Sequence, residues 1–265
     1  MERISVASQI AMIVTIIVSI GVPIALFLYF AIKKKAKKIC FVIGAITFIL
    51  FALVLERLMH GIMLSTFGNT LLTNTAFIAI YSGLAAGIFE ETGRLVAMKT
   101  VMKKNLTKEN ALMYGVGHGG IESIIIVGLT YISNLVTSIM INAGTLGPML
   151  EKLDEDTRAQ TIAGLAVLAK ATPTDFYLAG VERVIAIILH IGLSYLVYRA
   201  VKNNKYGLFV LAILIHAVID GITVSLANVI PVYGLEIILF VLVAVFTFFV
   251  YKAYKSEANA EIQAD

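Results

Sequence analysis

Three charged side chains, Glu90, Glu91 and Arg94, lie within five positions of an apolar run that otherwise has the composition of a membrane-spanning helix. A charged side chain at the centre of a bilayer costs about 2.5–3.5 kcal/mol on insertion scales, so such groups normally face a protein interior or a water-filled cavity. The two adjacent carboxylates also repel each other. A chain that contains this segment must therefore bring compensating polar groups to it from other helices.

The composition indicates an integral membrane protein. Of the 265 residues, 59% are apolar and 14% are charged, against about 25% charged residues in ordinary soluble domains. The apolar runs are about 20 residues long, which predicts helices rather than the shorter alternating strands of a barrel. The single Cys40 excludes a disulfide framework and a multi-cysteine metal site. We therefore expect an all-α integral membrane protein.

Lysine-rich clusters fix the predicted topology of a bundle of about seven transmembrane helices. The clusters at 33–38, 99–108, 199–205 and 252–255 fall on one side of the membrane, and the acidic segment 151–156 falls on the other. The positive-inside rule then places the N-terminus outside and the C-terminus in the cytoplasm. The net charge of +4 comes from these clusters, so we expect no nucleic-acid partner. The predicted spans are residues 7–32, 39–63, 75–101, 110–141, 177–200, 206–229 and 233–253.

The chain shows no internal repeat and no linker, so we expect a single polytopic membrane domain over residues 1–265. Its candidate catalytic core covers residues 75–225. The one sizeable loop, 142–175, is predicted to be extracellular, and its second half, from Thr157 to Lys170, is predicted to form a surface helix. The sequence carries no signal for the oligomeric state.

Pairs of charged or imidazole side chains occur at i, i+4 spacing on three of the predicted spans. This spacing puts both members of a pair on one helix face. Helices hide such faces by pointing them at one another, so we expect one shared polar site in the cytoplasmic half of the bilayer. The pairs are Glu90 with Arg94, His118 with Glu122, and His216 with Asp220.

The fifth predicted span adds His190, with Arg183 seven residues before it on nearly the same face and Glu182 beside Arg183. These three residues are interpreted either as supports behind the site or as metal ligands. The glycines in the segment 115–120 leave little side chain around His118, which lets neighbouring helices approach closely.

Two kinds of hydrolytic site fit these residues. A carboxylate beside an imidazole can share a proton and activate water, and a second imidazole can stabilise an oxyanion. Histidines with carboxylates can also bind one zinc ion, for which His118, His190 and His216 are the alternative ligands. The sequence leaves both open, together with a proton-coupled transporter or channel and a non-catalytic scaffold or immunity protein that uses the same residues.

Three motifs in fixed order on separate spans resemble the CPBP superfamily, which includes the type II CAAX prenyl endopeptidases. Two further segments, around His118 and His190, resemble more narrowly its YhfC branch, a family described as intramembrane metalloproteases. The resemblance covers about residues 75–225. The motifs are Glu90-Glu91-x-x-Arg94, Tyr114-x-x-x-His118 and His216-x-x-x-Asp220, and the further segments are Gly117-His118-Gly119-Gly120-x-Glu122 and Glu182-Arg183 followed by His190.

The resemblance implies a role for each matching residue. Glu90 would activate the attacking water with help from His118. His216 would hold the oxyanion, with Asp220 at the position of its usual partner. Arg94 would orient or neutralise the glutamates.

We therefore predict an intramembrane peptidase that hydrolyses a peptide bond within or near the cytoplasmic half of the membrane. The protein is expected in the cell membrane as a multi-pass protein, in a bacterium the plasma membrane, with the lipid bilayer and a membrane-protein or peptide substrate as partners. No cofactor is fixed by the sequence, and zinc is the alternative. Glu56, Arg57, His60 and Glu236 lie near span ends and are interpreted as snorkelling side chains outside the site. The predicted catalytic residues are Glu90, Glu91, Arg94, His118, Glu122, His216 and Asp220.

Overall fold

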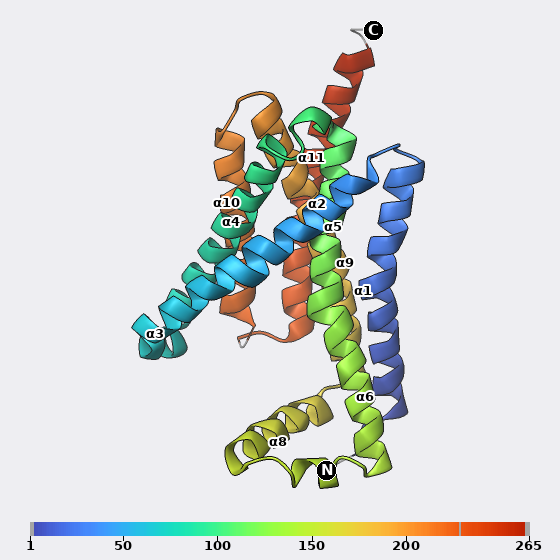
Figure 1. Ribbon diagram of the computed structural model, residues 1–265, viewed down its shortest axis with the longest axis vertical. Helices are drawn as coiled ribbons and strands as arrows, with labels where there is room; N and C mark the ends of the chain where they lie inside the picture. Colours follow the sequence, from blue (N-terminus) through green and yellow to red (C-terminus); the bar gives the residue numbers. More distant parts are fainter. Residues whose placement is uncertain (1–2, 228, 263–265) are drawn as a thin grey trace. The chain divides into compact units, whose positions relative to one another are not determined.

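The computed structural model describes residues 3–227 and 229–262, which form helices joined by short connections and contain no strand (Figure 1). The all-α prediction is confirmed. In chain order the elements are α1 (Val6–Ile32), α2 (Lys38–Phe48), the π-helix η1 (Ile49–Glu56), α3 (Arg57–Thr73), α4 (Thr75–Lys99), the 3₁₀ turn η2 (Lys103–Asn105), α5 (Lys108–Glu122), the π-helix η3 (Ser123–Gly128), α6 (Leu129–Ala143), α7 (Gly147–Leu150), α8 (Glu155–Lys170), α9 (Pro173–Lys202), α10 (Gly207–Leu226) and α11 (Val232–Ile262).

Within residues 3–227 and 229–262, six helical segments are long and apolar enough to cross a membrane. Helix α4 has 25 residues, which is long enough to span a bilayer, but its charged residues mean that composition alone does not identify it as a span. The seventh span and the orientation of the termini therefore stay predictions. The six segments are Val6–Ile32, Lys38–Gly68, Lys108–Ala143, Pro173–Lys202, Gly207–Leu226 and Val232–Glu257.

The chain divides into two compact units. The first consists of Met1–Val22 and Ser123–Val184, and the second of Pro23–Glu122 and Ile185–Asp265. The single domain over residues 1–265 stays a prediction.

The first unit has its own apolar core, which includes Met12, Ile141 and Phe176. Two hydrogen bonds join Ile4, just before α1, to Asn142, near the end of α6. The backbone N–H of Ile4 donates to Asn142 Oδ1 at 2.8 Å, and Asn142 Nδ2 donates to the Ile4 carbonyl at 2.8 Å. Helix α8 occupies the segment in which a surface helix is predicted, so that prediction is confirmed.

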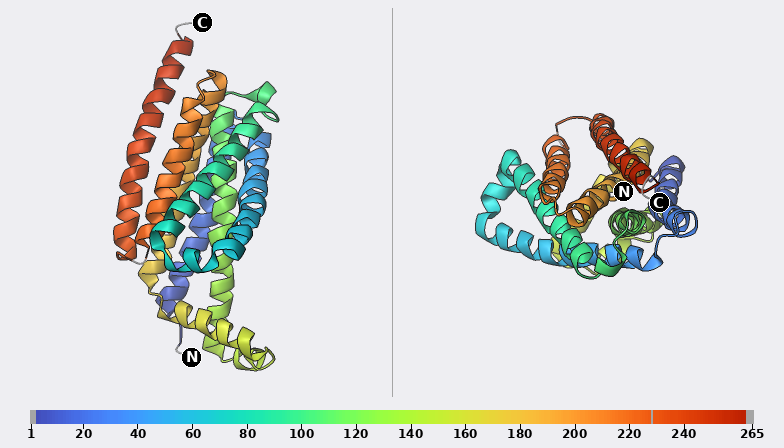
Figure 2. Two further views of the ribbon diagram at one scale, coloured as in Figure 1. Left: turned by 90° about the vertical axis from the view of Figure 1, so that its left-hand side faces the viewer. Right: turned by 90° about the horizontal axis from the view of Figure 1, so that it is seen from above.

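In the second unit, α4 packs along α10, and α2 packs along α5 (Figure 2). Glycines make these contacts possible, because a side chain would collide with the neighbouring backbone. A Cβ at Gly83 would lie 2.2 Å from the Ala217 carbonyl oxygen, and one at Gly117 would lie 2.0 Å from the Phe41 carbonyl oxygen. The contact at Gly83 joins α4 to α10, and the contact at Gly117 joins α5 to α2. Of these four helices, α4, α5 and α10 carry predicted site residues.

Replacing Gly44 by Ala is expected to destabilise the protein, because the new Cβ would lie 2.1 Å from the Tyr114 carbonyl oxygen and would force α2 and α5 apart. Overpacking of this kind costs about 1–3 kcal/mol. The measurement is the thermal unfolding midpoint of the purified protein in detergent. Gly61→Ala is the matched control, because nothing lies within 4 Å of a Cβ at Gly61. Equal midpoints for the two variants would contradict the close packing of α2 on α5.

Asp154 caps α8 by accepting a hydrogen bond from the Thr157 backbone N–H at 2.9 Å. Hydrogen bonds from Thr157 hold the pKa of the Asp154 carboxyl below its usual value. The capping contribution is therefore complete above the unfolded pKa and is lost as the pH falls through the folded pKa. Asp154→Ala is expected to speed amide hydrogen exchange at Thr157 at neutral pH, whereas Asp156→Ala should leave that rate unchanged.

Candidate functional site

Helix α4 carries three buried charged side chains inside the second unit. Glu90 is 7% exposed, and Glu91 and Arg94 are fully buried. The Arg94 Nε atom lies 3.5 Å from Glu91 Oε2, one helical turn away. Arg94 therefore forms its ion pair with Glu91, whereas the i, i+4 spacing predicted a pair with Glu90. The partners of the Glu90 carboxylate lie on other helices.

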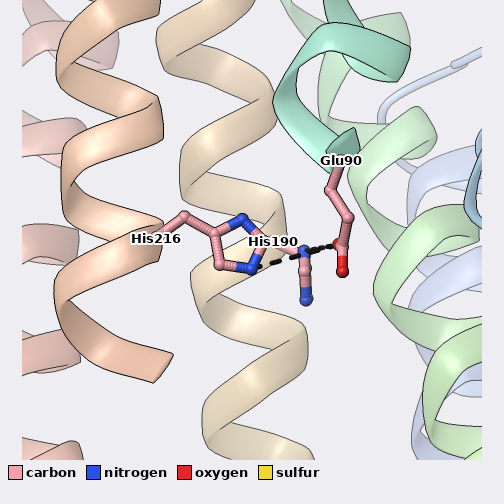
Figure 3. Close-up of side chains that lie close together, drawn as sticks. All are labelled: Glu90, His190 and His216. Carbon is pink, nitrogen blue, oxygen red and sulfur yellow. Dashed lines mark ion pairs between the residues drawn. The ribbon is translucent and has the colours of Figure 1, made fainter. Parts of the chain in front are cut away.

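The partners of Glu90 are three histidines from three other helices. His118 of α5 places its Nε2 atom 2.8 Å from Glu90 Oε2. The same oxygen lies 3.9 Å from His190 Nδ1 of α9 and 4.0 Å from His216 Nε2 of α10. Figure 3 shows Glu90, His190 and His216 reaching toward one point from three helices. The structure therefore contains the shared polar site that the sequence predicts.

Two of these imidazoles are held from behind by carboxylates. His216 Nδ1 lies 2.9 Å from Glu91 Oε1, and His190 Nε2 lies 2.7 Å from Glu122 Oε2. When these nitrogens donate their protons to the carboxylates, the other ring nitrogens, His216 Nε2 and His190 Nδ1, carry lone pairs that face Glu90. Arg94 supports this tautomer of His190, because its Nη2 lies 3.2 Å from Nδ1 and can only donate.

Glu90, His190 and His216 have the donor set of a metal centre. Each offers one ligand atom, and the three atoms lie within 4.8 Å of one another. Two imidazoles and one glutamate are the ligands of several catalytic zinc sites, which keep a fourth position open. The set differs from the predicted His118, His190 and His216 in one member. Glu90 takes the place of His118, because the His118 Nε2 atom is already bound to the Glu90 carboxylate.

The remaining predicted residues of the second unit lie around this centre. Asp220 Oδ2 lies 3.6 Å from His216 Nε2, so the predicted contact between these two residues is present. The side chain of Asp220 is 37% exposed, against 13% for Glu122. Glu122 contacts His190 on α9, a partner that the i, i+4 spacing on its own helix does not predict.

The sequence interpretation missed Glu56. We expected a snorkelling side chain near a span end, but Glu56 is 8% exposed and lies at the end of η1, within electrostatic range of His216 and Asp220. Its carboxylate is 3.3 Å from His60 Nε2, at the same i, i+4 spacing that marked the other polar pairs. That spacing was the signal that could have placed Glu56 beside the site.

Glu182 and Arg183 belong to the first unit, where the Arg183 guanidinium pairs with the Glu182 carboxylate. Their role as supports or ligands of the site stays a prediction.

Comparisons of the sequence with known proteins find relatives of this chain. The sequence model of the family described as YhfC intramembrane metalloprotease matches residues 16–247. The chain is 38% identical over 200 residues to the uncharacterized membrane protein YhfC of Bacillus subtilis (strain 168). The aligned region covers 75% of this chain and 77% of the relative. No solved structure matches the chain significantly. Together with the six apolar helices found in the part of the chain that the structure describes, these matches identify a multi-pass membrane protein.

The proposed ligand set predicts the metal content of the purified protein. We expect about one zinc ion per chain after equilibration with trace zinc and gel filtration, and less than a tenth of that in His190→Ala and His216→Ala, because each variant loses a ligand. His60→Ala is the matched control, since its imidazole contacts Glu56 and Tyr81 rather than Glu90. The measurement is elemental analysis by mass spectrometry. Equal zinc in the His216 and His60 variants would contradict the assignment.

A second prediction concerns Glu122, whose carboxylate contacts His190 Nε2, and it gives the expected change in zinc affinity. Glu122→Gln is expected to weaken zinc binding by about 10–100-fold, because an outer carboxylate orients the imidazole and raises its basicity. The affinity is measured by competition with a chelating dye. Glu151→Gln, at an exposed position of the loop between α7 and α8, should leave it unchanged.

Proposed function

The chain belongs to the YhfC intramembrane metalloprotease family, and from this premise we propose that it hydrolyses a peptide bond of a membrane protein at the polar centre around Glu90. The observation that carries the proposal is that one carboxylate oxygen, Glu90 Oε2, faces imidazole nitrogens from three different helices at 2.8, 3.9 and 4.0 Å. A purely structural ion pair does not require three imidazoles around a single oxygen.

Glu90, His190 and His216 are the residues that would hold the metal. A zinc ion bound there supplies a Lewis acid that makes a water more acidic and polarises the scissile carbonyl. Glu91 and Glu122 fix the orientation of the two ligand imidazoles from behind. Arg94 neutralises Glu91 and donates to His190 Nδ1, so ligation by that nitrogen requires this contact to be released.

His118 has a different task from the other two histidines. Its Nε2 shares a proton with Glu90 Oε2, and its Nδ1 has no hydrogen-bond partner in the part of the chain that the structure describes. The imidazole is fully buried beside the centre. His118 is therefore placed to accept a proton released during attack of water and to return it to the leaving amine.

The metal-free alternative uses the same residues in the roles implied by the CPBP resemblance. Glu90 takes the proton of the attacking water directly, and His216 holds the oxyanion. Both alternatives lose their chemistry when the Glu90 carboxylate is removed, and the zinc content of the wild-type protein distinguishes them. In both, we place the scissile bond within or near the cytoplasmic half of the membrane.

Glu90→Gln and His118→Ala are expected to lower proteolysis by at least about a hundredfold, the usual contribution of a general acid–base group. Membranes from cells that express the wild-type protein or one variant are compared by quantitative mass spectrometry of new peptide termini. Termini that depend on the wild-type residues identify the substrates. Glu151→Gln is the matched control, because it removes an exposed carboxylate far from Glu90 in the sequence.

The same set of termini in the wild-type and Glu90→Gln samples would contradict the proposal. Proton flux in proteoliposomes that disappears in Glu90→Gln, with no cleavage in either sample, would instead favour the transporter interpretation.

A further inference from the structure

A groove of about 490 Å³ lies on the second unit between α9, α10 and α11. Its apolar walls include Leu214 and Val218 of α10 and Val245 and Phe249 of α11, which are each more than half exposed. Such a surface contacts hydrocarbon when the helices stand in a bilayer. The groove therefore opens toward lipid and presents a shaped apolar surface to it.

Arg199 is the charged residue that lines this groove. Among the residues that the structure describes, no carboxylate forms an ion pair with Arg199. The neighbouring carboxylate, Glu257, is engaged elsewhere: Lys202 donates to it at 2.8 Å, and the Tyr195 and Tyr198 hydroxyls each donate to it at 2.7 Å. Among the described residues, Lys202 thus has a carboxylate counterion and Arg199 has none, so an external anion can pair with the guanidinium in the groove.

The length of the groove corresponds to one leaflet. Along α10 its lining extends from Leu211 to Ile219, and along α11 from Leu242 to Ala253. At 1.5 Å per residue these stretches measure about 12 and 16 Å, about half of the ~30 Å hydrocarbon core. Arg199 lies in the basic cluster 199–205, which the positive-inside rule assigns to the cytoplasmic side.

We propose that this groove binds an anionic phospholipid of the cytoplasmic leaflet, with an acyl chain between α10 and α11 and the headgroup phosphate on Arg199. A guanidinium binds phosphate oxygens through paired, charge-assisted hydrogen bonds. A transmembrane helix of a partner protein fits less well, because it is about 10 Å wide and needs the whole thickness of the core. The proposal does not depend on proteolysis.

A second apolar groove on the same unit provides an internal comparison. It measures about 430 Å³, lies between α9 and α11, and is lined by residues that include Ile188, Phe240 and Ala244, with no charged side chain. A lipid held there has no guanidinium to meet its headgroup. We therefore expect headgroup preference at the first groove and none at the second.

The test is native mass spectrometry of the full-length protein, incubated in detergent with equal amounts of phosphatidylglycerol and phosphatidylcholine that carry the same acyl chains. The wild-type protein is expected to retain phosphatidylglycerol preferentially. Arg199→Gln should lower its retention by about tenfold or more, the effect of losing a charged hydrogen bond, and Arg199→Lys should recover part of it. Lys205→Gln is the matched control, because it removes a positive charge from the same end of the unit without touching the groove.

Two variants that each fill one groove with a bulky side chain show which groove binds the lipid. Ala253→Phe fills the groove that contains Arg199 and is expected to abolish the preference for phosphatidylglycerol, whereas Ala244→Phe fills the second groove and should leave the preference intact. Equal retention of the two lipids by the wild-type protein, or equal losses in Arg199→Gln and Lys205→Gln, would overturn the proposal. Displacement of the lipid by a single-span helical peptide would show that the groove is a docking site for protein. Glu90→Gln should bind lipid as the wild-type protein does, so failure here leaves the proteolytic proposal untouched.

Discussion

The burial of two adjacent carboxylates on α4 is the constraint on which the second unit depends. Glu91 and Glu90 cannot both be neutralised by Arg94, because one guanidinium carries one charge and its Nε forms an ion pair with Glu91. An unpaired carboxylate inside a protein is strongly destabilising. The structure surrounds Glu90 with imidazoles from three helices, which can carry a proton or bind a metal and so compensate the second charge.

Close helix packing is what makes this compensation geometrically possible. Side chains as short as glutamate and histidine meet across helices only when the backbones approach closely, and Gly83 and Gly117 remove the Cβ atoms that would keep α4 from α10 and α2 from α5. Small residues serve the same purpose in membrane helices generally, where burial of apolar surface drives little association. The glycines and the polar residues therefore act together. The glycines allow the helix backbones to approach closely, and the polar contacts between the helices stabilise that short distance.

The sequence predicts the helices well and the partners of the polar side chains poorly. Helix positions follow from the length of apolar runs, so the predicted spans 7–32 and 177–200 correspond closely to Val6–Ile32 and Pro173–Lys202. Pairing depends instead on how each helix is rotated against its neighbours. The i, i+4 rule placed His118 and Glu122 on one helix face, but it did not predict that His118 contacts Glu90 and that Glu122 contacts His190.

Glu56 was misjudged for a related reason. Its position near the end of a predicted span indicated an interfacial side chain, but the residues before it form the π-helix η1 (Ile49–Glu56). A π-helical segment changes the rotation per residue, so the face on which Glu56 falls does not follow from a regular helical wheel. The Glu56 carboxyl group is therefore buried within electrostatic range of His216 and Asp220.

The surroundings of His118, His190 and His216 differ, and the differences suit these residues to different roles. His190 and His216 each have a carboxylate on the nitrogen that faces away from Glu90, an arrangement that fixes the tautomer and strengthens the imidazole as a ligand. Among the described residues, His118 has no carboxylate hydrogen-bonded to its Nδ1. Its Nε2 donates to the Glu90 carboxylate, so the lone pair lies on Nδ1, where the ring can accept a second proton. The chain thus separates the two imidazoles suited to hold a metal from the one suited to move a proton, and Glu90 is the residue that both functions share.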